Sequence, residues 1–415
     1  MRQDAGNLEY VKKMNRINVL NIIRGTQCIS RQQLAKLTGL TPAAISGIVR
    51  ELLEMEYIQE TGIGKSSGGR RPVKLQFNPE AGYAVGAEIR RKSTTIGIVN
   101  LQGKPVLIKE IQIDMSNPEA GISLMVKNIE ELIGESGIPK DKILAAGFAV
   151  PGLLDVRTKI VKRSPNLGEQ WTDFPVQASL EKYFNNIPLF IEHNSNAAAL
   201  AEHTLGKGKN NRSLVYINLG EGFSAGIIMD GKIVYGCNGH AGEIGHLVIM
   251  EDGPLCNCGN RGCLESLSAV PALVRKANNE INLCAEEDPL KQIWREKGEI
   301  NIKDILSCIN EVGSYAWQLI RQAGWYIGIG IAYAINFYNP EAIYLGGTLA
   351  GAKEILMEPL LESVYSHAFP AIARATMIEI SDLGSNAAFY GAGLGAIEQL
   401  FDVERAEILN WKEKT

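Results

Sequence analysis

Three cysteines within eight residues, Cys256, Cys258 and Cys263, constrain the fold of this 415-residue chain more than any other feature. With His246 upstream they form the pattern H-x9-C-x-C-x4-C, and glycines between them allow tight turns. Three thiolates and one imidazole make a closed tetrahedral zinc set that leaves no open position for a substrate. The alternative is a loop of unreacted buried cysteines, but cysteines this dense favour a metal. The pattern therefore predicts one structural zinc ion per chain.

The composition is that of an ordinary soluble protein with a sizeable core. Hydrophobic residues make up 45% and charged residues 21% of the chain, and the seven cysteines are odd in number. The first residues lack the apolar core of a signal peptide, so a disulfide framework is not expected. The longest apolar stretch, Ala323 to Ile335, is shorter than the roughly 20 residues that a membrane span needs. We expect a cytoplasmic protein of two or three domains that makes no contact with a membrane.

Charge is divided unevenly along the chain. Residues 1–80 hold 12 Lys and Arg against 7 Asp and Glu, a net charge of +5. The remaining residues hold 30 against 39, a net charge of −9. A basic end on an acidic body indicates that this end meets a polyanion.

The basic segment has the pattern of three helices and a hairpin. Apolar residues at three- and four-residue spacings predict a first helix over Leu8 to Arg24. A capping-box pattern at Ser30 opens a second helix, which ends at Gly39. Thr41 then caps a third helix that runs to about Met55. Two short helices joined by a glycine-containing turn are typical of a helix-turn-helix, and the glycine-rich hairpin after them predicts a wing.

The predicted DNA contacts come from the second and third helices and from the tip of the wing. They are Arg31, Thr41, Ala43, Ala44, Ser46, Arg50, Lys65, Ser67, Gly68, Gly69, Arg70 and Arg71. The start of a recognition helix reads base edges, and small side chains there allow close approach. Glycines and arginines in the wing suit the narrow minor groove of A·T-rich DNA. The alternative, a structural three-helix unit, leaves the basic wing unexplained.

Beyond Asn78-Pro79, strands and helices alternate in two similar halves. Tyr83 to Asn100 reads as strand, turn and strand, and Leu214 to Gly231 repeats this shape. Further short buried strands are predicted at 144–152, 189–192 and 342–346, and helices at 196–205 and 313–337. This pattern predicts a two-lobed α/β body with a cleft between the lobes.

The metal motif also carries a resemblance to a known family. Gly242-Glu-Ile-Gly-His246, followed by the segment from Cys256 to Glu265, resembles the signature of the ROK family (repressors, open reading frames, sugar kinases). Further matching segments follow in the family's order: Val150-Pro-Gly152, Ser164-Pro-Asn166, Glu192 to Glu202 and Leu345-Gly-Gly347. The resemblance covers nearly the whole chain. With its helix-turn-helix and wing, the chain is most similar to family repressors of Gram-positive xylose operons.

The resemblance implies a winged helix-turn-helix over residues 1–78 and an actin-like, ribonuclease H-like sugar-kinase fold after it. The first α/β lobe would span 79–195, completed by a C-terminal helix over 385–415. The second lobe would span 196–384 and hold the zinc site and the dimerisation helices. The apolar helix around Trp317, Trp325 and Tyr326 is one candidate for the dimer interface, although aromatic residues at that spacing also suit a core.

The resemblance also implies sugar contacts at Asn166, Asn194, Glu243, His246 and Glu265. Carboxylates and amides suit a ring of hydroxyl groups, and His246 can bind zinc through one ring nitrogen and donate from the other. Without the family pattern, two surface carboxylates flanking a metal loop would explain Glu243 and Glu265 equally well.

Three departures from the family's kinases argue against phosphoryl transfer. Asn194 stands where those kinases carry the catalytic aspartate, and an amide cannot take a proton from a sugar hydroxyl. Glu88-Ile-Arg-Arg-Lys-Ser93 replaces the first glycine-rich phosphate loop, whose backbone N–H groups would cradle phosphate. Gly220-Glu-Gly-Phe-Ser-Ala-Gly226 adds a carboxylate and a bulky ring to the second loop.

These observations favour a DNA-binding repressor whose inactive kinase-like body senses a monosaccharide, xylose or another. The alternative is a regulator that retains sugar-kinase activity. One recognition helix reads only a few base pairs, so we expect a homodimer or a tetramer on a pseudo-palindromic duplex operator.

Overall fold

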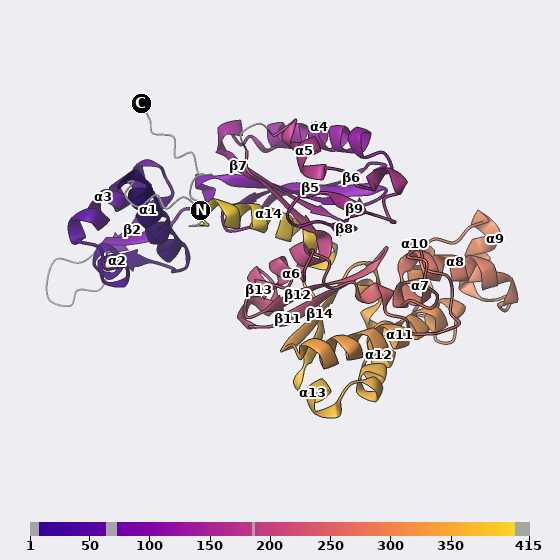
Figure 1. Cartoon of the computed structure of the whole chain (residues 1–415). Coiled ribbons are helices and arrows are strands. Elements are labelled where there is room, and N and C mark those ends of the chain that lie inside the picture. The colour runs from indigo at the N-terminus through magenta and orange to yellow at the C-terminus, as the bar shows by residue number, and fades with distance from the viewer. Residues whose placement is uncertain (1–7, 64–72, 185–186, 403–415) are drawn as a thin grey trace.

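The computed structural model describes residues 8–63, 73–184 and 187–402. Figure 1 shows a small helical domain at the start of the chain and two α/β lobes after it. This arrangement confirms the predicted fold class: a winged helix-turn-helix followed by a two-lobed α/β body. Within the described ranges, no helix is both long and apolar enough to span a membrane.

The first domain is built from three helices and a three-stranded antiparallel sheet of order β1-β3-β2. Its elements are α1 (Leu8–Arg24), β1 (Ile29–Ser30), α2 (Arg31–Thr38), α3 (Pro42–Glu54), β2 (Ile58–Ile63) and β3 (Val73–Phe77). The predicted caps are present: Ser30 and Gln33 form a reciprocal capping box, and Thr41 accepts a hydrogen bond from the Ala44 N–H. Gly39 ends α2 at a φ of 69°, a backbone conformation that favours glycine.

The sheet of the first lobe has the order β10-β7-β4-β5-β6. Its strands are β4 (Tyr83–Ile89), β5 (Ser93–Asn100), β6 (Pro105–Gln112), β7 (Ile143–Val150) and β10 (Leu189–His193). Helices α4 (Pro118–Ser136) and α5 (Val176–Glu181) cover one face, and α14 (Ala387–Leu400) covers the other (Figure 1). A glycine in β7 allows α14 to pack closely against the sheet, because a Cβ on Gly147 would lie 1.9 Å from the carbonyl oxygen of Ala392.

The second lobe repeats the strand arrangement of the first, with the order β13-β12-β11-β14-β15. Its strands are β11 (Leu214–Leu219), β12 (Phe223–Met229), β13 (Lys232–Ile233), β14 (Ala342–Gly346) and β15 (Met377–Ile380). Side chains of β11 alternate between two cores. Val215, Ile217 and Leu219 pack with α11 (Tyr315–Tyr338) and α12 (Lys353–His367), whereas Leu214 and Tyr216 pack towards α6 (Asn194–Thr204).

The remaining elements decorate the two lobes. They are β8 (Leu153–Leu154), β9 (Val161–Arg163), α7 (Leu264–Ser268), α8 (Val270–Glu280), α9 (Pro289–Lys297), α10 (Ile302–Ser307) and α13 (Pro370–Ala375).

Trp317 and Trp325, which we considered for a dimer interface, are half-buried within the single chain. Arg321 stacks on the Trp317 ring at 4.8 Å, and Trp325 meets the His367 ring edge-on.

Sequence reasoning missed a contact between the two ends of the chain. Asn21 of α1 donates a side-chain hydrogen bond of 2.9 Å to the Phe401 carbonyl oxygen, just past α14. The Phe401 ring also meets Phe77 of β3 edge-on, at 6.1 Å between centroids. The buried core of the first domain is therefore continuous with the residues around α14.

Candidate effector cavity, metal cluster and DNA-binding surface

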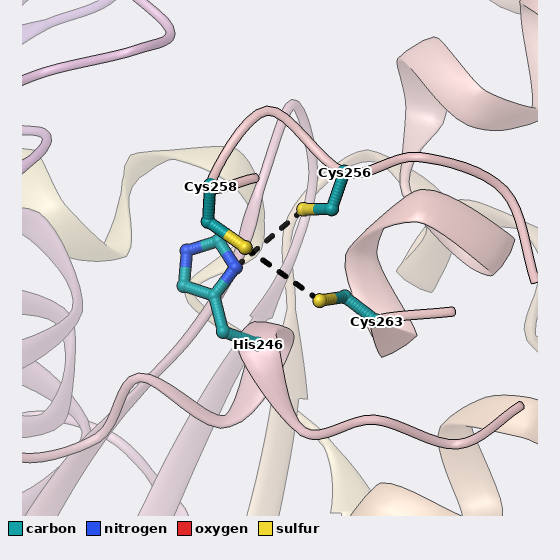
Figure 2. Close-up of side chains that lie close together, drawn as sticks. All are labelled: His246, Cys256, Cys258 and Cys263. Atoms are coloured by element: carbon teal, nitrogen blue, oxygen red, sulfur yellow. Dashed lines mark hydrogen bonds between the residues drawn. The ribbon is translucent and has the colours of Figure 1, made fainter. Parts of the chain in front are cut away.

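The structure brings together the four residues of the metal motif. Their ligand atoms all lie within 4.8 Å of one another, and in Figure 2 the sulfur atoms and one ring nitrogen turn towards a common point. The Cys258 and Cys263 sulfurs are 3.7 Å apart, as are the Cys256 sulfur and His246 Nδ1. A tetrahedron with Zn–S bonds of 2.3 Å has edges of about 3.8 Å. The donor set therefore fits zinc in both chemistry and spacing.

Glycine and backbone pairing shape the loop that carries the sulfurs. A Cβ on Gly262 would lie 1.5 Å from the Met250 carbonyl oxygen, so only glycine fits there. The Cys256 N–H donates to the Asn260 carbonyl oxygen at 2.8 Å, which closes a turn that contains Cys258. Cys263 directly precedes α7, whose second residue is Glu265. Any metal that holds the loop would therefore also hold the start of α7.

A cavity of about 240 Å³ lies between the two lobes. Its wall includes every residue that we predicted to contact a sugar: Asn166, Asn194, Glu243, His246 and Glu265. The first lobe contributes the loop after β9, and the second contributes the single turn at 244–246 and α7. Segments separated by up to a hundred residues thus converge on one space.

Asn166 and Glu265 approach each other across the cleft at Gly222. A Cβ on that glycine would lie 2.7 Å from both the Asn166 amide nitrogen and Glu265 Oε2. Glu265 Oε2 also accepts a hydrogen bond of 3.1 Å from the Phe223 N–H. The Glu265 carboxylate is therefore held at a fixed position, as recognition of a ring of hydroxyls requires, and the Asn166 amide lies beside it.

Glu243 and His246 connect the cavity with the metal cluster. Glu243 Oε2 lies 3.9 Å from His246 Nε2, while His246 Nδ1 faces the sulfurs. Burial, followed by the negative charge of Glu265, raises the pKa of Glu243 to about 7. A carboxyl group poised near neutrality can accept a hydrogen bond when ionised and donate one when protonated.

Sequence reasoning missed three further cavity residues. His193 is 9% exposed, and burial lowers its pKa to about 4, so its imidazole is neutral at pH 7. Arg91 donates to the Asn166 carbonyl oxygen at 3.2 Å, and Arg163 donates across the cleft to the Asn257 carbonyl oxygen at 3.4 Å. Two of these residues could have been found from their positions in the sequence. His193 directly precedes the predicted site residue Asn194, and Arg163 lies three residues before Asn166.

The segment that replaces the first phosphate loop is folded back on itself. The Arg90 guanidinium binds the Glu88 carboxylate at 3.4 Å and the Glu110 carboxylate at 3.6 Å, and it donates to the Thr95 hydroxyl. Glu88 is buried, and burial raises its pKa to about 7 although Arg90 opposes the shift. Behind Glu88 and Asn194 a second cavity encloses only about 20 Å³, close to the volume of one water molecule.

The exposed start of α3 forms the predicted DNA-reading surface. Thr41, Ala43, Ala44, Ser46 and Arg50 are exposed, whereas the opposite face of the helix is buried in the domain core. The Thr41 hydroxyl caps the helix, and the Ser46 hydroxyl donates to the Pro42 carbonyl oxygen at 2.8 Å.

The predicted cations of this surface differ in their environment. Arg50 lies 3.9 Å from Glu54, and both side chains are mostly exposed. Arg31 already pairs with Glu60 of β2 at 2.8 Å, which ties α2 to the wing strand. The predicted contacts at the wing tip, Lys65, Ser67, Gly68, Gly69, Arg70 and Arg71, lie outside the described residues.

Comparison with known proteins matches both parts of the chain. Residues 84–398 match the ROK family, and residues 15–59 match a winged helix-turn-helix DNA-binding family. The xylose repressor of Bacillus spizizenii (strain W23) is 30% identical over 402 residues, which cover 96% of this chain and 99% of the relative.

One solved structure resembles nearly the whole chain, and another resembles about three quarters of it. A ROK family transcriptional regulator, a homologue of the Escherichia coli MLC protein, superposes with a TM-score of 0.79 at 28% identity, covering 96% of this chain and 99% of the regulator. A ROK family glucokinase from Streptomyces griseus, solved with glucose and AMPPNP, superposes with a TM-score of 0.67 at 25% identity. It covers 76% of this chain and all of the kinase.

Proposed function

The chain belongs to the ROK family, and from this premise we propose that it is a sugar-responsive, DNA-binding transcriptional repressor of carbohydrate-utilisation genes. One observation carries the proposal: a single chain joins an exposed recognition helix to a cavity lined with groups that suit a sugar. The similarity to a xylose repressor over 96% of this chain supports both halves of the proposal.

The proposed effector is a monosaccharide, xylose or another, that occupies the cavity between the lobes. Asn166, Asn194, Glu243, His246 and Glu265 would bind its hydroxyl groups. Carboxylates accept hydrogen bonds from hydroxyls, and amides both accept and donate, so this set can distinguish the orientations of neighbouring hydroxyls. A cavity of about 240 Å³ is of the size that a single sugar ring requires.

The proposed role of zinc is structural. His246, Cys256, Cys258 and Cys263 would fill all four positions of a tetrahedral ion, so the metal would only fix the loop geometry. The loop leads directly into α7, and His246 would turn its free ring nitrogen towards the cavity. Sugar affinity would therefore depend on metal content although the metal contacts no substrate.

We propose that the kinase-like body is catalytically inactive. Asn194 cannot act as a general base, and Arg90 folds back on Glu88 in the segment that would otherwise receive phosphate. The second candidate function, a regulator that retains sugar-kinase activity, is favoured by the likeness to a glucokinase solved with a nucleotide analogue. Incubation with labelled ATP and a panel of sugars separates the two functions.

The proposed operator is a pseudo-palindromic duplex bound by a homodimer or a tetramer. A recognition helix of 13 residues reads only a few base pairs, so discrimination requires two half-sites about one helical turn apart. Half-site spacing is strict, so a small change in the relative orientation of two recognition helices would weaken binding. Closure of the lobes on a sugar would supply such a change and relieve repression.

Titration of an operator duplex with and without sugar tests the whole proposal. A thermal-shift screen first identifies the sugar, since a ligand at about 100 times its Kd stabilises a protein by roughly 2.7 kcal/mol. We expect the sugar to weaken operator binding, and Glu243→Ala to abolish this response without altering sugar-free operator affinity. Unchanged affinity in wild type would refute the coupling, and tighter binding would make the sugar a co-repressor.

A further inference from the structure

One hairpin of the first lobe contacts the second lobe at two places. It consists of β8 and β9, which pair antiparallel, and it lies on the side of the first lobe that faces the second (Figure 1). At its tip, Val156 lies against Gly239 of the second lobe, where a Cβ would come 2.5 Å from the Val156 side chain. At its last residue, the Arg163 guanidinium donates to the Asn257 carbonyl oxygen at 3.4 Å. The hairpin therefore bridges the two lobes.

The contact at the tip belongs to a buried junction between the lobes. Glu192 of β10 is 1% exposed, and it accepts hydrogen bonds from the Asn196 amide at 3.1 Å and from the Tyr235 hydroxyl of the second lobe at 2.9 Å. Tyr235 lies four residues before Gly239 in the loop that follows β13. Buried hydrogen bonds are costly to break, because their groups would lose partners away from water. We therefore expect this side of the cleft to stay joined when the lobes move.

The contact at Arg163 lies at an exposed edge of the cleft. Arg163 lines the effector cavity, and both Arg163 and its partner Asn257 are exposed to solvent. Its hydrogen bond to a neutral carbonyl oxygen is long, at 3.4 Å. A single exposed hydrogen bond of this kind is weak enough to break and form again while a ligand enters. The lobes can therefore separate at Arg163 while the buried junction holds.

The acceptor of the Arg163 hydrogen bond belongs to the metal loop. Asn257 stands between Cys256 and Cys258, two of the four predicted ligands. Metal binding would therefore fix the Asn257 carbonyl oxygen at the place that Arg163 reaches. Three thiolates and one neutral imidazole would also give a zinc complex a net charge of about −1, which attracts a nearby guanidinium. A loop without metal would offer Arg163 neither the fixed acceptor nor the charge.

We propose that Arg163 is a positioning residue that latches the first lobe onto the metal loop, so that closure of the cleft around the effector requires an intact metal loop. This inference rests on the proposed function, because the cleft is the one that we assign to the effector. When only part of a protein is in the binding-competent state, its apparent Kd is the intrinsic Kd divided by that fraction. The latch raises the closed fraction without contacting the sugar. Its loss would therefore weaken the binding of every sugar by the same factor.

Förster transfer between the lobes tests the latch in the full-length, zinc-loaded protein without any sugar. Dyes would be attached to ketone-bearing amino acids introduced at Glu131 of α4 and Glu296 of α9, two exposed positions in different lobes, so that the native cysteines stay unlabelled. We expect Arg163→Gln to widen the distribution of interlobe distances and Arg163→Lys to keep most of the closed population. Arg157→Gln, which removes an exposed cation from the same hairpin, is the control and should match wild type. Unchanged distances in Arg163→Gln would overturn the latch.

Calorimetry with xylose, glucose, mannose and N-acetylglucosamine separates a latch from a direct sugar contact. We expect Arg163→Gln to raise the Kd of each sugar that wild type binds by about tenfold, and to raise by the same factor the sugar concentration that releases the operator. A Kd that rises although the interlobe distances are those of wild type would make Arg163 a sugar ligand and overturn the latch. Failure of every sugar to bind wild type would refute the proposed function, whereas the distances in sugar-free protein would still test the latch.

Removal of the metal tests the dependence on the metal loop. A chelator should widen the interlobe distances of wild type as Arg163→Gln does, and it should widen those of Arg163→Gln no further, because the latch is already lost. The comparison would be made at a temperature at which circular dichroism shows both metal-free proteins to be folded. Metal-free wild type that stays closed, or a chelator effect of full size in Arg163→Gln, would overturn the link between Arg163 and the metal loop.

Discussion

Arg24, the last residue of α1, forms an ion pair with Glu398 in the last turn of α14. The Arg24 guanidinium also lies over the Phe401 ring, 4.7 Å from its centroid. At its other end, Ser385 lies two residues before α14 and lines both cavities, and Ala387, the first residue of α14, lines the smaller one. One helix of 14 residues, about 21 Å long, thus connects the effector cavity with the DNA-binding domain.

This relationship predicts that Glu398→Gln will weaken the coupling between sugar and operator. Sugar affinity should be unchanged, because Glu398 lies at the far end of α14 from the cavity. The factor by which sugar changes operator affinity, typically about 5 to 150, should fall towards one. Operator titrations with and without sugar measure this factor. Glu358→Gln, which breaks an exposed ion pair with Arg321, is the control and should respond as wild type does. Full coupling in Glu398→Gln would show that the contact carries no signal.

Metal binding predicts a loss of stability in Cys258→Ser. The purified wild type should carry about one zinc ion per chain, and the variant should lose it, because three ligands hold the ion less well than four. A loss of about 2 kcal/mol would lower the melting temperature of a domain of this size by roughly 4 to 8 °C. Cys284→Ser, which removes a cysteine outside the cluster, should keep both the metal and the stability. A metal-free wild type with an undiminished ligand response would defeat the zinc proposal.

The basic wing predicts a change in salt dependence when Arg70 and Arg71 are replaced by Ala together. Each lost phosphate contact removes roughly 0.9 from the slope of log affinity against log salt concentration. The double variant should therefore bind the operator more weakly and with a slope smaller by up to about 1.8. Fluorescence anisotropy at several salt concentrations measures both quantities, and sugar binding serves as the internal control. Equal operator affinity in the two proteins would count against the wing.

The altered catalytic groups predict that no sugar phosphate will form above background. Asn194→Asp alone should not restore turnover, because Arg90 still folds back on Glu88. A coupled assay for ADP release across the sugar panel checks both proteins, with a ROK sugar kinase as positive control. Measurable turnover in wild type would replace the repressor-only proposal by the bifunctional one.

The buried Glu88 predicts a pH-dependent cost in stability. Burial raises its pKa from 4.5 to about 7, so the folded protein holds the proton over a range in which the unfolded chain has lost it. Stability contributed by this group is therefore present below about pH 4.5 and is lost as the pH rises to 7.

Glu88→Gln should then gain stability relative to wild type between pH 5 and pH 8, by up to about 3 kcal/mol. Urea unfolding at the two pH values measures the gain. Glu110→Gln, which removes the exposed partner of Arg90, should show little of this gain in stability between the two pH values. A difference between wild type and Glu88→Gln that is the same at both pH values would contradict this account.

Local patterns in the sequence predicted the elements of the first domain and the ligand set of the metal. Capping is local, since Ser30 and Thr41 each bond a backbone N–H three residues away, and both caps are present in the structure. Three of the four metal ligands likewise lie within eight residues, so their spacing alone indicated a common centre. The strand-turn-strand pattern of Leu214 to Gly231 likewise predicted the hairpin of β11 and β12.

Only the tertiary structure determined which residues are in contact across the cleft and which are in contact between the two ends of the chain. Arg91 and Arg163 are ordinary exposed cations in the sequence, and their bonds to Asn166 and Asn257 arise from the approach of separate segments. The ion pair between Arg24 and Glu398 joins residues 374 positions apart, and no periodic pattern in the sequence predicts it. Side-chain spacing determines a helix face or a metal loop because those contacts close within a few residues. The pKa of Glu88 and the route from cavity to operator depend on how two lobes and one last helix pack, which no local pattern encodes.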